Sequence, residues 1–291
     1  MLAPVSQSGS NIAVTINGTS GNTYKTNLAG KNMVARSAYK YTATVTGGTN
    51  VSGEDANWGD DPTPDTNGHE YVDLGLSVKW ATCNVGASEP EDYGDYFTWG
   101  ETEPYYESGY AQEDPQTHWK SGKSSYNGFS GGYNWVIYKY SKTGLSNLTK
   151  YCNKSSYGYN GFTDSKTVLD PEDDAAYVNW GGDWRMPTKD EFDELRNNDN
   201  CTWTRTTMNG VNGYKVVSKK SGYAGNYIFL PAAGFRTDLK LLGVGSGGYY
   251  WSSSLGTDYP YYAYLLNFGS SDYDTSGNYR GVGRSVRPVC H

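Results

Sequence analysis

The C-terminal stretch, residues 241–291, most strongly limits what this chain can fold into. It contains no Lys, Glu, Gln or Met, although the rest of the chain uses all four. Its Tyr, Ser, Gly, Asn and Asp residues form a composition that favours strands and ordered loops over helices. The same residue types suit a binding surface, because Tyr gives a rigid amphipathic ring while Ser, Gly and Asn give adaptable hydrogen bonds.

Two polar, aromatic runs within this stretch are the predicted binding residues. The first surrounds Pro260, where Tyr262 and Tyr264 would share one face of a strand. The second precedes the closing segment, and we expect the two runs to meet on one surface. The predicted ligand-binding set is Tyr249, Ser254, Thr257, Asp258, Tyr259, Tyr261, Tyr262, Tyr264, Ser270, Asp272, Tyr273, Asp274, Ser276, Asn278 and Tyr279. The alternative is a set of solvated loops with half-buried tyrosines.

The absent residue types also have a genetic interpretation. A codon that ends in C cannot encode Lys, Glu, Gln, Met or Trp, so randomised adenines in Asn codons would give this bias. The stretch therefore resembles the diversified region of the variable protein of a diversity-generating retroelement, whose binding face is mutated at adenines. The alternative is a β domain rich in Tyr, Ser and Gly that merely avoids long side chains. A binding role does not depend on this choice.

Length and charge narrow the remaining classes. A chain of 291 residues predicts one large or two smaller domains, and its 28 Tyr and 9 Trp are too many for a disordered chain. The net charge of −7, without any basic run, argues against a nucleic-acid partner. No apolar run is long enough to span a bilayer. Cysteines at 83, 152, 201 and 290 lack the CxxC spacing of a zinc site, and the sequence does not choose among their three pairings or free thiols.

The chain divides at a Gly-, Asp- and Pro-rich linker, residues 61–68. Residues 1–60 are predicted as a small all-β segment, with alternating strands at 11–16 and 39–45. Residues 31–45 and 56–58 resemble the closing strands of Bacteroidetes fimbrillin-type pilus subunits. The resemblance implies that this segment is part of a pilin module, and residues 69–291 form the main domain.

The main domain is predicted to hold two helices among short strands. At residues 169–176, Asp170 is the expected N-cap and Pro171 the first helical residue. The second helix, at 187–195, opens with a capping box of Thr188 and Glu191. Strands are expected within 70–87 and at 96–101, 201–206, 214–217 and 226–231, and a long functional or decorative loop at 104–159.

Five motifs in order resemble the Fibrobacter succinogenes major paralogous domain. They are YVDLGL at 71–76, NWGGDWRMPT at 179–188, FLPAAGF at 229–235, YWSSS at 250–254 and SVRPV at 285–289. The resemblance implies an α+β, C-type-lectin-like domain of antiparallel strands, two helices and long loops, whose closing strands carry the ligand-binding face. Trp180, Trp184, Phe235 and Trp251 are large enough to form its core, and we expect Arg287 to pair with a carboxylate or a carbonyl.

Calcium and catalysis are the remaining questions. Acidic residues gather at Asp170 and 172–174, but helix capping and the helix dipole explain them, so neither a metal nor a cofactor is expected. The Glu-Pro pairs at 89–90 and 103–104 lack the asparagine that calcium lectins place after this dipeptide. The three histidines are far apart and Cys290 stands by itself near the end, so we do not expect an enzyme.

These observations predict an exported binding protein of a gut-type bacterium or its phage. The N-terminus lacks a secretory signal pattern, which we interpret as a mature or trimmed start. The protein would act as an adhesin or receptor-binding protein on a cell or virion surface, recognising an unknown protein or glycan on another cell or host surface. One alternative is a lectin-like glycan-binding module. The other is a structural pilus or surface subunit, for which pilus subunits are the partners.

Overall fold

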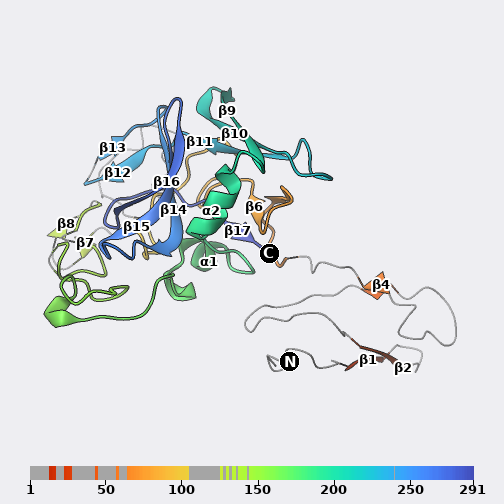
Figure 1. Cartoon of the computed structure of the whole chain (residues 1–291), viewed down its shortest axis with the longest axis horizontal. Coiled ribbons are helices and arrows are strands. Elements are labelled where there is room, and N and C mark those ends of the chain that lie inside the picture. The colour runs from red at the N-terminus through yellow and green to blue at the C-terminus, as the bar shows by residue number, and fades with distance from the viewer. Residues whose placement is uncertain are drawn as a thin grey trace. The chain divides into compact units, whose positions relative to one another are not determined.

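The structure is a computed structural model of the chain. It describes residues 64–104 and 133–291, except 136, 143 and 239, together with the backbone of short strands outside these ranges. Internal contacts divide the chain into two units, Met1–Asp65 and Thr66–His291 (Figure 1).

Antiparallel strand pairs make up the described part of the first unit. β1 (Ala13–Asn17) pairs with β2 (Thr23–Asn27), and β3 (Ala43–Thr44) pairs with β4 (Asn57–Trp58). The strands predicted at 11–16 and 39–45 overlap β1 and β3. The rest of the predicted pilin-like segment lies outside the described residues.

The second unit is built from small antiparallel sheets (Figure 1). One three-stranded sheet has the order β11 (Tyr227–Pro231), β10 (Val211–Ser218), β9 (Cys201–Met208). A second has the order β14 (Gly248–Leu255), β15 (Tyr262–Phe268), β16 (Tyr273–Tyr279). A third has the order β17 (Val289–Cys290), β6 (Lys79–Ala81), β5 (Tyr71–Val72). The two-stranded pairs are β12 (Phe235–Thr237) with β13 (Lys240–Leu242), and β7 (Ser125–Tyr126) with β8 (Phe129–Ser130).

Two α-helices, α1 (Ala175–Trp180) and α2 (Lys189–Arg196), complete the described part of this unit. Short 3₁₀ turns occur at η1 (Tyr159–Gly161) and η2 (Pro171–Asp173). Helix α2 lies against β14, β15 and β16 (Figure 1). Because antiparallel sheets and two helices share one unit, the predicted α+β class is confirmed.

The start of the first helix differs from the prediction. Asp170 precedes the η2 turn, and its side chain makes no capping hydrogen bond. Helix α1 begins later, at Ala175, and its N-cap is Asp174, whose Oδ1 accepts hydrogen bonds from the backbone N–H groups of Ala176 at 2.9 Å and Tyr177 at 3.0 Å. Its Oδ2 accepts the N–H of Met186 at 2.8 Å. Asp174, and not Asp170, is therefore the N-cap of α1, and it also binds the backbone 12 residues along the chain.

The predicted capping box of α2 is confirmed. The Thr188 hydroxyl accepts the N–H of Glu191 at 3.3 Å, and the Glu191 carboxylate accepts the N–H of Thr188 at 2.7 Å. Phe192 and Leu195, spaced one helical turn apart, are both fully buried. Arg185 forms a paired contact with the same carboxylate, at 2.8 and 2.5 Å. The motif before the helix therefore fixes how the helix begins.

The strand predicted at 96–101 is wrong. Only Phe97 forms a bridge there, where its N–H donates to the carbonyl of Arg284 at 2.9 Å, and the N–H of Trp99 donates to the carbonyl of Arg280 at 3.0 Å. The chain then turns, because the N–H of Glu101 donates to the carbonyl of Thr98. Because the pairing with Arg280 and Arg284 does not continue past this turn, residues 96–101 do not form a strand.

Tryptophans fill the core of the second unit, as predicted. Trp184 and Trp251 are fully buried and Trp180 is nearly so. Phe235 differs from the prediction, because it is only half-buried. The buried indole N–H groups of Trp99, Trp184 and Trp251 donate to backbone carbonyls, that of Trp251 to the carbonyl of Phe97 at 2.8 Å, whereas the indole N–H of Trp80 has no hydrogen-bond partner among the described residues. Such pairing avoids the cost of an unsatisfied donor in the core.

Arg287 ties the closing segment to two sheets and is fully buried. Its guanidinium donates to the carbonyls of Ala81 at 3.0 Å, Thr82 at 2.7 Å and Phe229 at 3.0 Å, and to the amide oxygen of Asn84 at 2.9 Å. The prediction that Arg287 pairs with a carbonyl is confirmed. Because no carboxylate shares these contacts, burial lowers its pKa.

The four cysteines are unpaired in the structure. Three of them are buried, while Cys83 is half-buried. Burial raises the pKa of the Cys201 thiol to about 11 and that of Cys290 to about 12. These two thiols therefore behave as small apolar side chains of the core.

Candidate binding surface

The hairpin of β15 and β16 brings the two predicted polar runs side by side. Its register places Tyr262 opposite Tyr279 and Phe268 opposite Tyr273. The connecting turn is closed by the N–H of Gly269, which donates to the carbonyl of Asp272 at 3.0 Å. The open end of the hairpin therefore carries tyrosines from both runs.

Five tyrosine rings meet at this end, and we call Tyr157, Tyr259, Tyr261, Tyr262 and Tyr279 the tyrosine cluster. The ring centroids of Tyr261 and Tyr262 are 4.6 Å apart, and those of Tyr262 and Tyr279 are 4.9 Å apart. Tyr157 and Tyr259 each pack on Tyr261, at 5.1 and 5.6 Å. Tyr259 is 49% exposed and Tyr279 39%, so a partner can reach the rings.

One member of the cluster was missed in the sequence. Tyr157 comes from the segment 104–159, which was predicted only as a long loop, and Trp135 of that segment contacts Tyr279 edge-on at 6.4 Å. The surroundings of Tyr157, with two serines before it and a glycine after it, repeat the composition of the tail. That likeness was the available signal.

The turn that presents Tyr259 and Tyr261 is held by its backbone. The Asn153 amide donates to the carbonyl of Thr257 at 2.9 Å, and the Lys154 ammonium donates to the carbonyl of Asp258 at 2.5 Å. Within the turn, the N–H of Tyr262 donates to the carbonyl of Tyr259 at 2.8 Å. These contacts do not use the side chains of Thr257 and Asp258, which are exposed.

Within the cluster, the pKa values of the Tyr261 and Tyr262 phenols are raised. A hydrogen bond with Tyr279, together with burial, raises the pKa of Tyr262 to about 12. A neutral phenol can both donate and accept a hydrogen bond. The cluster therefore offers flat apolar rings edged by neutral polar groups.

Tyr273 lies away from the cluster, at the other end of β16. It lies six positions before Tyr279, a distance of roughly 20 Å along a strand. Its ring stacks on Trp203 with centroids 4.6 Å apart, and its hydroxyl donates to the side-chain oxygen of Asn198 at 2.7 Å. Asp274 beside it lies 3.6 Å from Arg196. The predicted set thus falls into more than one group.

Three predicted residues make contacts that support the scaffold. The Ser254 hydroxyl accepts the N–H of Lys189 at 3.0 Å, and the Lys189 ammonium lies 5.5 Å from the ring centre of Tyr264. The Ser276 hydroxyl accepts a hydrogen bond from the Asn267 amide at 2.9 Å. These side chains link the sheet to α2 or brace the hairpin.

The remaining predicted residues make no ring contact with the tyrosine cluster. Tyr249 packs edge-on against Phe235 at 5.1 Å, with the Arg284 guanidinium 5.4 Å from its ring centre. The Asn278 side-chain oxygen accepts the N–H of Tyr279 at 2.8 Å. Thr257, Asp258, Ser270 and Asp272 are exposed to solvent.

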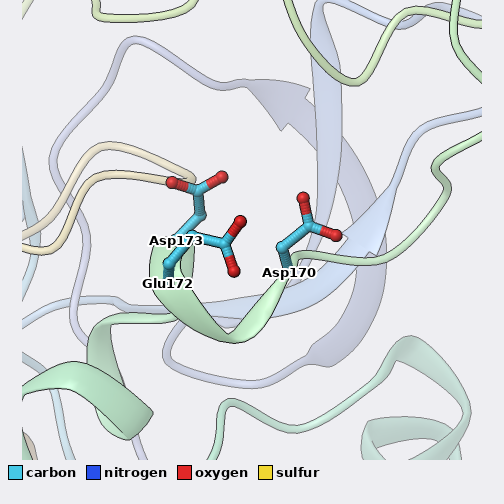
Figure 2. A group of neighbouring side chains, drawn as sticks. All are labelled: Asp170, Glu172 and Asp173. Carbon is cyan, nitrogen blue, oxygen red and sulfur yellow. The ribbon is translucent and has the colours of Figure 1, made fainter.

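An acidic group at the η2 turn is the candidate metal centre among the described residues (Figure 2). Carboxylate oxygens of Asp170, Glu172 and Asp173 lie within 4.8 Å of one another. The Lys150 ammonium is 2.7 Å from Asp170, 2.5 Å from Asp173 and 3.7 Å from Glu172. A lysine cation therefore occupies the position where these oxygens converge.

The buried member of this group, Asp173, has its acceptor positions engaged. Besides Lys150, it accepts hydrogen bonds from the hydroxyls of Tyr140 and Tyr151 and from the Lys139 ammonium at 3.2 Å. These four donors use the lone pairs that a calcium ion would need. Although burial alone would raise it, the pKa of Asp173 is lowered by Lys150 and the other donors. The group is therefore an ion-paired cluster that connects the η2 turn to Lys139 and Lys150.

The histidines form no catalytic arrangement in the part of the chain that the structure describes. The His69 ring stacks on Trp180 with centroids 3.8 Å apart and planes 4° apart. His291 contacts the Arg185 guanidinium at 3.1 Å. His118 lies outside the described residues.

Comparison with protein-family models, with curated proteins and with solved structures gave no match for this chain. Among the described residues, no helix has the length and apolar character needed to cross a membrane.

Proposed function

We propose that this chain is a surface-displayed binding protein that recognises its partner through the tyrosine cluster. The main support is that five tyrosine rings from two distant parts of the chain pack together, and that Tyr259 and Tyr279 among them are exposed. The proposed action is recognition by stacking and hydrogen bonding, outside the cell and without catalysis.

The physical case rests on the low cost of ordering these side chains. Tyrosine has few rotatable bonds, and contacts within the cluster already restrict them, so binding loses little conformational entropy. The rings offer apolar faces, and their neutral hydroxyls offer hydrogen bonds at the rim. A surface of this kind suits either a protein or the C–H face of a sugar, and the experiment below separates the two.

The motifs support a more specific proposal, a C-type-lectin-like domain of the Fibrobacter succinogenes major paralogous type with a fimbrillin-like segment before it. The core tryptophans and the carbonyl contacts of Arg287 are consistent with the scaffold role proposed for those motifs. Diversification by a retroelement is part of this proposal. It is supported by the contacts to the backbone carbonyls of Thr257 and Asp258, which would let these two exposed side chains vary.

The test compares the whole chain with a variant carrying Tyr261→Ala and Tyr279→Ala. Both proteins would be applied to a glycan array and to intact bacterial and host cells, and captured surface proteins would be identified. Truncation of two central aromatic anchors should weaken binding about 30-fold or more. Tyr177→Ala is the matched control, because Tyr177 is 45% exposed on α1 and does not belong to the cluster.

Retention of full binding by the double variant, with its fold intact by circular dichroism, would contradict the proposal. Binding confined to the array would select the glycan-binding alternative over a protein receptor. Incorporation into filaments by wild type and variant alike, without binding to array or cells, would favour a structural pilus subunit.

A further inference from the structure

A separate pocket lies beside β5 and β6 and shares no residue with the tyrosine cluster. Its volume is about 470 Å³. Pockets that hold small molecules span roughly 300–1,000 Å³, so this one has the right size. It is lined by Gly68, His69, Glu70, Thr82, Cys83, Ala87, Ser88, Glu89, Pro90 and Trp180.

An aromatic pair forms one side of the pocket. The His69 imidazole lies flat on the Trp180 indole, with ring centroids 3.8 Å apart. Two residues shortly before His69 are anchored by hydrogen bonds. The Trp184 indole N–H donates to the carbonyl of Thr66 at 2.8 Å, and the Asn67 amide donates to the carbonyl of Trp180 at 2.7 Å. The imidazole is therefore held as a flat surface. Burial lowers its pKa, which favours the uncharged form of the ring.

Residues 87–89, which also line the pocket, are fixed by hydrogen bonds to their backbone. Asp92 Oδ2 accepts the N–H groups of Ser88 at 3.3 Å and Glu89 at 3.1 Å. The N–H of Ala87 donates to the carbonyl of Asn84 at 3.0 Å. A wall held in this way is formed before any ligand arrives, which reduces the cost of binding.

The acidic side chains Glu70 and Glu89 line the pocket, and no Lys or Arg does. Glu70 and Glu89 are exposed at the pocket, and neither side chain has an ion pair or a hydrogen bond within the described ranges. None of the ten lining residues is Lys or Arg. The carboxylates therefore attract a cation, while the hydroxyls of Thr82 and Ser88 can bond polar groups on it.

We propose that this pocket binds a small hydroxylated organic cation, an amino sugar with a free ammonium group. The ammonium group would face Glu70 and Glu89, and the C–H face of the sugar ring would lie on the His69 imidazole. The hydroxyls would bond Thr82 and Ser88. This inference goes beyond the proposed function and depends on other residues.

The experiment titrates the full chain with glucosamine and with its neutral counterpart glucose, followed by saturation-transfer NMR and calorimetry. Glucosamine should bind saturably and glucose should bind at least about 5-fold more weakly, as expected for the loss of partly exposed ion pairs. A variant with Glu70→Gln and Glu89→Gln should lose the same preference. The control carries Glu103→Gln and Asp199→Asn, which make the same charge change at exposed positions outside the pocket.

A second readout uses Cys83, the half-buried cysteine that lines the pocket. Glucosamine should slow its alkylation by iodoacetamide at least about twofold at saturation, as measured by mass spectrometry of the Cys83 peptide, because bound ligand covers the thiol. The proposal is overturned if glucosamine does not bind saturably, if glucose binds equally well, or if the Gln variant keeps its affinity while remaining folded.

Discussion

Asp174 shows how a single carboxylate can organise two parts of the chain. It caps α1 through Ala176 and Tyr177 and also accepts the N–H of Met186, which precedes α2. Removing it leaves one buried N–H without an acceptor in addition to the lost cap. The Asp174 side chain thus connects the start of α1 to the segment that precedes α2.

Asp174→Ala should therefore lower the free energy of unfolding by about 2–4 kcal/mol, the sum of a lost cap and an unsatisfied buried donor. Urea denaturation followed by tryptophan fluorescence measures this change. Asp190→Ala, at an exposed position in the first turn of α2, is the control. A loss below about 0.5 kcal/mol for Asp174→Ala would mean that water replaces both contacts.

The carboxylates around Lys150 give the protein a defined acid sensitivity. Although burial opposes it, the ammonium groups of Lys150 and Lys166 lower the pKa of Asp170 to about 2, and the pKa of Asp173 is lowered as well. A carboxyl whose folded pKa lies below its unfolded value stabilises the fold above the unfolded pKa. That stabilisation is lost as the pH falls through the folded pKa.

Unfolding free energy should thus decline between about pH 4 and pH 2, and Lys150→Met should flatten this part of the curve. Urea denaturation across that range measures both curves. Lys142→Met is the control for loss of a lysine outside the group. An unchanged slope in the Lys150 variant would show that other carboxyl groups determine the acid response.

Among the elements, the turn at 256–262 has a backbone held by residues from far along the chain, whereas its Thr257 and Asp258 side chains are exposed. Asn153 and Lys154 hold it by the carbonyls of Thr257 and Asp258. Replacing both Thr257 and Asp258 by Ala should change the unfolding free energy by no more than about 0.5 kcal/mol. Asn153→Ala removes a hydrogen bond and should cost about 1 kcal/mol. Thermal and urea denaturation of the variants test the difference, and the reverse order of effects would refute this account.

The elements that could be predicted from the sequence are those fixed by neighbours in the chain. The capping box needs only Thr188 and Glu191, three residues apart, so it was predictable. By contrast, the second contact of Asp174 reaches the distant Met186, and residues 96–101 form only a bridge, between Phe97 and the distant Arg284. Such distant partners leave no periodic pattern in the sequence.

The same limit applies to the candidate site at the scale of the whole molecule. Tyr262 and Tyr279 could be expected to meet, since both lie in the Tyr-rich tail. The contact between Tyr157 and Tyr261 required a loop from more than 100 residues earlier in the chain. Tyr273 has the same composition around it but stacks on Trp203 instead. Composition identified the residue types of the site, and only the fold sorted them into a cluster.

Arg287 allows the cohesion of the second unit to be tested. Its four contacts join the closing segment to Ala81, Thr82 and Asn84 on one side and to Phe229 on the other. Arg287→Met keeps much of the buried volume but leaves these acceptors without a donor. We expect the variant to lose about 3 kcal/mol or more of unfolding free energy, because the acceptors remain buried.

Arg287→Lys should rescue little of this loss, since one ammonium group cannot reach acceptors that the planar guanidinium bridges. Arg196→Met, in which the replaced side chain is partly exposed on α2, is the control. Urea denaturation followed at tryptophan and by far-UV circular dichroism measures both the loss and its cooperativity. If Arg287→Met costs less than about 1 kcal/mol, or if Lys restores full stability, the closing segment is held by apolar packing and not by this guanidinium.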